Sequence, residues 1–180
     1  FRSTMKIWIE CCPSCGYCSR DISGGSTNVK DVVSSPVYKQ QKTDQNFPEL
    51  ANQFLCWLII AESAGDFDKA GWAALHAAWV CDDKNREEAA GKCREKALNL
   101  FRVAGDQGMS FAADKDSEDA VTVDLLRRSG QFEAAQSICE KVLQREMAPF
   151  MQKIIQFQIN LIEMRDTDCH NLEEIAGLTE

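Results

Sequence analysis

The chain has 180 residues, of which 44% are hydrophobic, and it carries a formal net charge of −8. This length suits one ordinary domain with a small appendage, and the apolar content excludes a chain that is disordered throughout. No apolar run approaches the roughly 20 residues that a membrane-spanning helix needs, so no membrane-spanning helix is predicted in these residues.

The charge is unevenly distributed along the chain. Residues 1–47 hold six basic and four acidic side chains, whereas residues 48–180 carry a net charge of −10. An acidic body repels phosphate backbones, which disfavours nucleic-acid binding by the second part. A mildly basic N-terminal head that binds nucleic acid stays open as an alternative.

The nine cysteines are not arranged as in a secreted disulfide scaffold. Four are crowded into Cys11–Cys18, and the other five are scattered. Secreted frameworks are usually shorter chains with an even number of spaced cysteines. Cys56, Cys93 and Cys139 lie on or beside the apolar stripes of predicted helices, where a free cysteine acts as a small hydrophobic residue. We therefore expect a reducing, cytoplasmic compartment.

A short β-prone segment, residues 4–10, leads into a cysteine-proline turn and is predicted as a strand. Cys12 and Cys15 then have the C-x2-C spacing of a metal-binding turn. Two thiolates at this spacing can hold one ion, and Gly16 permits the tight backbone that such a turn needs. Zinc is the predicted cofactor.

A structural zinc site needs four ligands, and Cys12 and Cys15 supply two. Cys18, one further C-x2-C step along the chain, is predicted as a third ligand. Cys11 is an alternative, and so is the Cys169-His170 pair near the C-terminus, if the last helix folds back on the head.

Cys15 and Cys18 also resemble the C-x2-C pair of thiol–disulfide oxidoreductases. In those enzymes a helix begins at the pair and stabilises the nucleophilic thiolate, whereas this chain soon reaches Gly24-Gly25. His76 is expected to be a packed, hydrogen-bonded helix residue. No phosphate-binding glycine loop, nucleophile elbow or His-Glu-x-x-His motif is present. No catalytic or small-molecule cofactor-binding residue is therefore assigned.

Residues 19–47 have no sustained period and are predicted as loop and linker, with one helical turn at 28–33. From Pro48 onward the apolar residues recur with the helical period of 3.6, so a domain boundary is placed between 47 and 48. Trp57, Trp72 and Trp79 are expected to anchor the core of the first hairpin. The periodicity predicts helices at 48–65, 66–81, 85–105, 117–129, 131–142 and 149–165.

The helix boundaries rest on local signals. Gly65 and Gly105 are predicted to end helices, and Asn85-x-x-Glu88 is interpreted as a capping box. Arg127-Arg128 is interpreted as a helix-end pair that the helix macrodipole favours.

Two junctions share the pattern Gly-x-Phe-acid-x-Ala. They are Gly65–Ala70 and Gly130–Ala135, and each stands between two amphipathic segments. The pattern resembles the turn between the two helices of a tetratricopeptide repeat. The motifs lie 65 residues apart, whereas two repeats of about 34 residues would separate them by about 68. The sequence therefore predicts a degenerate array.

A resemblance to a known family is carried by five stretches: Arg2–Met5, Trp8-Ile9, Cys12–Tyr17, Ala77–Asp83 and Asp124–Phe132. The chain resembles an uncharacterised bacterial family that joins a CPxCGY zinc knuckle to tetratricopeptide-like helices. The resemblance implies a fold and a zinc site but no reaction. It also implies a first CPxCG-type pair upstream of the segment that begins here, which this sequence does not contain.

We therefore expect a mainly α protein, with a zinc-knuckle and short-strand head over residues 1–47 and a degenerate tetratricopeptide-like antiparallel bundle over residues 48–180. The expected function is a non-catalytic protein-interaction module that binds a protein or peptide partner through its helices. A zinc- or thiol-dependent enzyme and a nucleic-acid-binding zinc module are the alternatives. The sequence assigns no oligomeric state.

Overall fold

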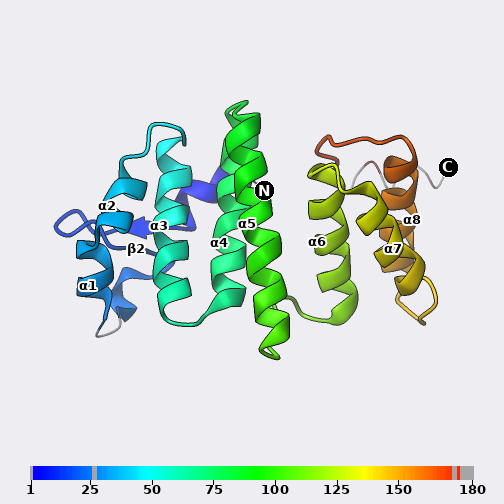
Figure 1. The fold of residues 1–180 in the computed structure, drawn as a ribbon, viewed down its shortest axis with the longest axis horizontal. Helices are drawn as coiled ribbons and strands as arrows, with labels where there is room; N and C mark the ends of the chain where they lie inside the picture. Colours follow the sequence, from blue (N-terminus) through cyan, green and yellow to red (C-terminus); the bar gives the residue numbers. More distant parts are fainter. Residues whose placement is uncertain (1, 26–27, 172–173, 175–180) are drawn as a thin grey trace. The chain divides into compact units, whose positions relative to one another are not determined.

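The computed structural model describes residues 2–25, 28–171 and 174, and the chain is mainly helical (Figure 1). It divides into two compact units, residues 1–111 and residues 112–180. The predicted boundary between residues 47 and 48 lies within the first unit, and a separate head domain stays a prediction. No helix in the described ranges is long and apolar enough to cross a membrane.

The N-terminal head begins with a 3-10 helix, η1 (Arg2–Ile7), followed by strands β1 (Glu10–Cys11) and β2 (Cys18–Ser19). The two strands pair antiparallel, with Cys11 opposite Cys18. The strand predicted over residues 4–10 is therefore wrong for most of its length. A strand needs a partner, and β2 is only two residues long, so the preceding residues bond locally instead, as in Trp8 N–H to the Met5 carbonyl at 3.0 Å.

The predicted linker contains a 3-10 turn, η2 (Ile22–Gly24), and two short helices, α1 (Val29–Ser34) and α2 (Pro36–Lys42). Ser35 caps α2, because its hydroxyl accepts the Tyr38 N–H at 3.2 Å, and Pro36 occupies the first turn. Tyr38 is the buried residue of this pair of helices. One buried position makes no apolar period, which is why the sequence pattern indicated a loop.

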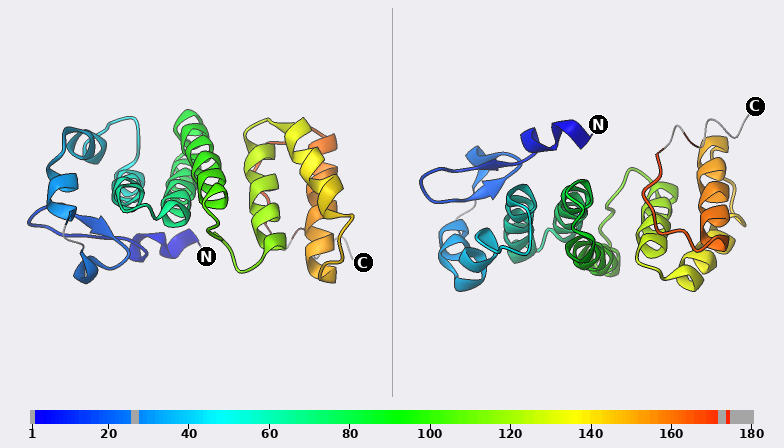
Figure 2. Two further views of the ribbon diagram at one scale, coloured as in Figure 1. Left: turned by 60° about the horizontal axis from the view of Figure 1, so that its bottom comes forward. Right: turned by 90° about the horizontal axis from the view of Figure 1, so that it is seen from above.

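The first unit continues with α3 (Glu49–Ser63), α4 (Phe67–Asp83) and α5 (Glu87–Asp106), in which α4 packs against both neighbours. Small residues of α4 allow this close approach. A methyl group added at Gly71 would come within 2.5 Å of the Phe101 ring of α5. The head lies beside the α3–α4 pair (Figure 2).

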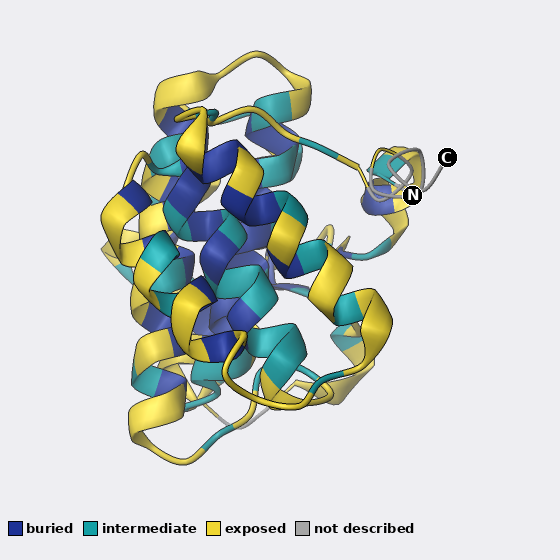
Figure 3. Cartoon of the chain, turned by 90° about the vertical axis from the view of Figure 1, so that its right-hand side faces the viewer, coloured by how far each residue is buried: buried dark blue, intermediate teal, exposed yellow. Residues whose placement is uncertain are grey.

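The second unit consists of α6 (Lys115–Arg128), α7 (Phe132–Val142) and α8 (Pro149–Glu163), which pack against one another. Buried residues face inward and exposed residues face solvent along these amphipathic helices (Figure 3). The six long helices predicted from the 3.6-residue period are all confirmed. The core of the second unit consists of Val123, Phe132, Ala135, Cys139, Val142, Ile155, Ile159 and Ile162.

The two Gly-x-Phe-acid-x-Ala junctions adopt the same backbone turn. Gly65 and Gly130 have φ angles of 79° and 73°. The N–H of the following residue bonds to the carbonyl five residues earlier, at 2.9 Å in both turns. This Schellman geometry favours glycine, because a Cβ atom strains the left-handed backbone. The turns alternate with amphipathic helices, and the tetratricopeptide-like classification stays a prediction.

The junction between α4 and α5 has the same turn, with asparagine in place of glycine. Asn85 has a φ of 52°, and the Arg86 N–H bonds to the Cys81 carbonyl at 2.9 Å. The predicted capping box is therefore wrong: Asn85 ends α4, and the N-cap of α5 is Arg86, whose side chain makes no capping bond. Helix α5 also extends to Asp106, past the predicted stop at Gly105.

Candidate functional site

The cysteine turn between β1 and β2 is closed by backbone hydrogen bonds. The Cys12 N–H donates to the Tyr17 carbonyl at 2.7 Å, and the Gly16 N–H donates to the Cys12 carbonyl at 2.8 Å. Gly16 has a φ of 79°, so the tight turn predicted from this glycine is confirmed. The turn brings the thiols of Cys12 and Cys15 together, within hydrogen-bonding range of each other.

The turn also favours the thiolate form of Cys12. Hydrogen bonds from the backbone N–H of Cys15, then from that of Ser14, and a further bond with the Cys15 thiol lower the pKa of Cys12 from its ordinary value. The thiolate is the form that binds a metal ion, because a ligating sulfur must be deprotonated. That Cys12 and Cys15 bind zinc stays a prediction.

Cys18 is placed differently from Cys12 and Cys15. Its sulfur is bonded to that of Cys11 across the two-stranded sheet, and the two Cα atoms are 4.1 Å apart. A disulfide sulfur is no thiolate, so Cys18 can act as a ligand only when this bond is reduced. Its role as a third zinc ligand stays a prediction.

The other candidate ligands are engaged elsewhere. His170 lies in the second unit, where its Nε2 is 3.1 Å from Asp166 Oδ2 and its Nδ1 is 2.6 Å from Glu174 Oε2. Within residues 2–25, 28–171 and 174, no group of three or more His, Cys, Asp or Glu side chains is placed to hold a metal ion. The described chain thus brings two zinc-ligand candidates together as free thiols.

Cys15 and Cys18 also lack the arrangement that the C-x2-C pair has in thiol–disulfide oxidoreductases. Cys15 is a free thiol, whereas Cys18 is bonded to Cys11. Within the described residues 19–25, the chain after Cys18 forms the short 3-10 turn η2, and no α-helix begins there. The macrodipole that activates the thiolate in such enzymes is therefore not positioned here.

Tyr38 of α2 fastens the cysteine turn to the helices. Its hydroxyl donates to the Gly16 carbonyl at 2.9 Å and accepts the Cys18 N–H at 3.0 Å. The side chain is 1% exposed, and burial raises the Tyr38 pKa, which keeps the phenol protonated. Sequence reasoning missed this residue; the Ser35-Pro36 helix start followed by an aromatic residue was the available signal.

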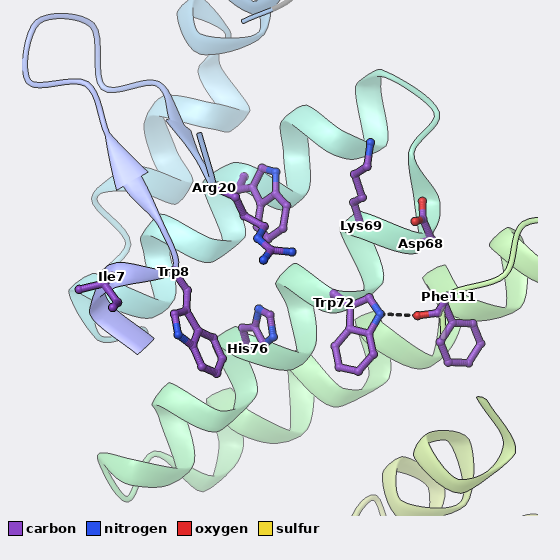
Figure 4. Close-up of a pocket in the computed structure, with 9 residues that line it drawn as sticks. Ile7, Trp8, Arg20, Asp68, Lys69, Trp72, His76 and Phe111 are labelled. Carbon is purple, nitrogen blue, oxygen red and sulfur yellow. Dashed lines mark hydrogen bonds between the residues drawn. The ribbon is translucent and has the colours of Figure 1, made fainter. Parts of the chain in front are cut away.

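A pocket of about 690 Å³ lies between the head and the helices of the first unit (Figure 4). Its walls are mainly aromatic, with charged side chains at two places. The head contributes Ile7, Trp8 and Arg20; α3 contributes Trp57; α4 contributes Asp68, Lys69, Trp72 and His76; and Phe111 completes the lining.

His76 sits at the centre of an aromatic cluster. Its ring centroid is 5.2 Å from those of Trp8, Phe54 and Trp79, and 5.8 Å from that of Trp72. Burial, and then the positive charge of Arg20, lowers the His76 pKa to about 4, so the imidazole is neutral at pH 7. His76 is packed as predicted, but its buried Nδ1 has no hydrogen-bond partner within the described residues.

The three tryptophans of the first hairpin differ in how far they are buried, and Trp57 and Trp72 both line the pocket. Trp57 is 7% exposed, as expected of a core residue, whereas Trp72 and Trp79 are only partly buried. The Trp72 Nε1 donates to the Phe111 carbonyl at 2.6 Å, which holds the indole at the pocket wall (Figure 4). The burial expected of a core residue is thus confirmed for Trp57, whereas Trp72 and Trp79 keep part of their surface exposed.

Residues 4–161 match the family described as an uncharacterized protein conserved in bacteria (DUF2225). The chain belongs to the DUF2225 family. No curated protein and no solved structure is similar enough to the chain to count as a match. The expected membership of an uncharacterised bacterial family is thus confirmed, while the zinc knuckle and the tetratricopeptide likeness stay predictions. The DUF2225 match includes the cysteine turn and every residue that lines the pocket.

The pocket of this DUF2225 chain was not predictable from its sequence. Its lining residues come from four segments that are up to 104 positions apart, between Ile7 and Phe111. Trp72 and His76, one helical turn apart, are the part of the lining that a sequence pattern can place on one face.

Proposed function

We propose that this DUF2225 chain is a non-catalytic protein-interaction module that binds a peptide segment of a partner protein in the pocket of its first unit. The observation that carries this proposal is the pocket itself, whose wall is built jointly by the head and by α3 and α4. An aromatic-lined concave site with a few polar groups is the usual form of a binding site in proteins.

The pocket has the dimensions of an extended segment. Its α4 wall runs from Asp68 to His76, and a helix rises about 1.5 Å per residue, so the wall is about 12 Å long. An extended chain advances about 3.3 Å per residue, so about four residues match this length. Ile7 lies at the pocket edge and is 71% exposed, which offers a further apolar contact.

In this proposal, zinc at the cysteine turn is structural. Cys12 and Cys15 are the ligands that the turn brings together, and Cys18 joins them once its bond to Cys11 is reduced. When bound, the ion supplies a cross-link, which in small zinc domains contributes about 10–16 kcal/mol of apparent binding free energy. Remaining ligands come from Cys11 or from a pair upstream, as the resemblance implies. The two hydrogen bonds of the Tyr38 hydroxyl connect the cysteine turn to α2 and so hold in place the part of the head that lines the pocket.

The zinc part is tested by the metal content of the purified protein, with free thiols counted before and after chelation. We expect near one zinc per chain and two or more thiols released by the chelator. A Cys12→Ser variant should lose the metal, whereas Cys139→Ser, at a buried site in the second unit, should retain it. Protein without metal, when purified with zinc present throughout, would overturn the zinc assignment.

The binding part is tested by selecting peptides from a displayed random library on the zinc-loaded protein. We expect enriched peptides whose binding falls at least tenfold in a Trp72→Ala variant that keeps its helical content. Phe150→Ala is the matched control, because Phe150 is an exposed aromatic residue of the second unit. No enrichment, or equal binding to both variants, would exclude the pocket as a peptide site.

A further inference from the structure

We propose that the pocket recognises a peptide segment in which a carboxylate adjoins an aromatic side chain, with Arg20 binding the carboxylate. This inference rests on the proposed peptide-binding function and adds the chemical class of the ligand. Two observations support it. Lys69 is paired with an acidic side chain whereas Arg20 is not, and aromatic side chains line the pocket around them.

Arg20 is the cation that the pocket leaves available. It makes no hydrogen bond or ion pair within residues 2–25, 28–171 and 174, and its side chain reaches into the pocket above His76 (Figure 4). Lys69, in contrast, is paired with Asp66, with 2.7 Å between Nζ and Oδ2. A guanidinium with free N–H groups binds a carboxylate through two parallel hydrogen bonds.

The neighbours of Arg20 do not neutralise it. His76 carries no charge at pH 7, and the positive field of Arg20 is one of the causes of its lowered pKa. Asp68 lines the pocket beside Lys69, away from the Arg20 guanidinium (Figure 4). An incoming carboxylate would therefore meet an uncompensated guanidinium beside an aromatic wall, which can bind it through two parallel charge-assisted hydrogen bonds.

The walls on either side of His76 suit an aromatic side chain. Trp8 and Trp72 flank the imidazole, with centroid distances to it of 5.2 Å and 5.8 Å (Figure 4). The Trp72 indole is already held by its bond to the Phe111 carbonyl, so little side-chain entropy is lost when a ligand ring packs on it.

A peptide fits these features better than a nucleic acid. One available cation, in a chain of net charge −8, cannot neutralise a run of phosphates. A single carboxylate requires only one guanidinium. The ligand class is therefore an acidic-aromatic peptide.

The test uses two labelled probe peptides with capped ends, Gly-Ser-Phe-Asp-Ser-Gly and the same peptide with Asn in place of Asp. Fluorescence anisotropy with the zinc-loaded full chain should show at least about tenfold tighter binding of the Asp peptide, the usual effect of a hydrogen-bonded charge. Arg20→Gln should remove this preference, so that the variant binds both peptides alike. Arg20 is exposed, so the substitution should leave the fold intact.

Lys30→Gln is the matched control and should change the affinity for the Asp peptide by less than about threefold, because Lys30 is an exposed cation of α1 that does not line the pocket. Equal binding of the two probes, no binding of either, or an unchanged preference in Arg20→Gln would overturn the carboxylate assignment. Peptides from the displayed library that still depend on Trp72 would then leave the proposed function standing. If no peptide depends on Trp72, the proposed function itself fails.

Discussion

The two units use the same helical turns but have different centres. In the first unit, aromatic rings surround His76, which is neutral at pH 7. In the second unit, the guanidinium of Arg127 is fully buried, at 0% exposure. The two units therefore share the same turn between helices but differ in their interiors. The first unit has an aromatic pocket, and the second has a buried ionic cross-link.

The Arg127 cross-link ties the chain after α8 back to α6. The Nε donates to Gln158 Oε1 at 2.7 Å, Nη2 to Asp124 Oδ1 at 3.0 Å, and Nη1 to the Asp166 carbonyl at 2.7 Å. The Asp168 carbonyl accepts a further bond from Nη2 at 3.0 Å. The interpretation of Arg127 as a helix-end charge was therefore incomplete, because the residue is an internal brace of the second unit.

The largest expected effect is that of replacing this brace. Arg127→Met removes the donor to the half-buried Asp124 carboxylate, to the buried Gln158 amide oxygen and to two carbonyls, and should lower the free energy of unfolding of the second unit by about 3 kcal/mol. Lys153→Met, an exposed site on α8, is the matched control and should change it by less than about 0.5 kcal/mol. Urea denaturation followed by hydrogen exchange in α8 measures both; equal values would show that the cross-link does not brace the unit.

The centre of the first unit should respond to acid. The His76 pKa is about 4, below its ordinary 6.5, so the unfolded chain binds a proton first. The stabilisation from neutral His76 is fully present above pH 6.5 and is lost as the pH falls toward 4, by about 3 kcal/mol in total. His76→Phe, which cannot titrate, should lack this part of the pH dependence in urea denaturation between pH 7 and 4.

The pKa of His170, in the second unit, is shifted in the opposite direction from that of His76. Burial alone would lower its pKa, but hydrogen bonds with Glu174 and Asp166, together with their charges, raise it above 6.5. Its stabilisation is therefore present at low pH and is lost as the pH rises through the raised value. The measurement is the free energy of unfolding against pH, from urea denaturation. If His170→Gln changed its dependence between pH 7 and 4 in the same direction as His76→Phe, the opposite pKa shifts assigned to the two histidines would be wrong.

The smallest expected effect concerns the turn that the units share. Gly65→Ala and Gly130→Ala place a Cβ on left-handed backbone, and each should cost about 1–2 kcal/mol. Gly91→Ala, inside α5 with open space around the new methyl group, should instead stabilise by about 0.5–1 kcal/mol. Thermal unfolding of the three variants gives the comparison, and unequal costs at Gly65 and Gly130 would show that the two turns are not equivalent.

The sequence was sufficient where the signal is local. Six helices follow from apolar residues at the 3.6-residue period, and the turns at Gly65 and Gly130 follow from the left-handed backbone that glycine allows. The tight turn that brings Cys12 and Cys15 together was predicted from the C-x2-C spacing and Gly16. Asn85 shows the limit of such signals, because it ends a helix as glycine does, although the surrounding pattern indicated a helix start.

Only the tertiary structure decided how distant residues meet. It bonds Cys18 to Cys11, seats Tyr38 on the cysteine turn, surrounds His76 with rings from three segments, and buries Arg127 beneath the chain that follows α8. The physical reason is the distance along the sequence over which each effect acts. Helix period and backbone strain act within a few residues of sequence, whereas burial, ring packing and charge pairing depend on what the folded chain places opposite each side chain.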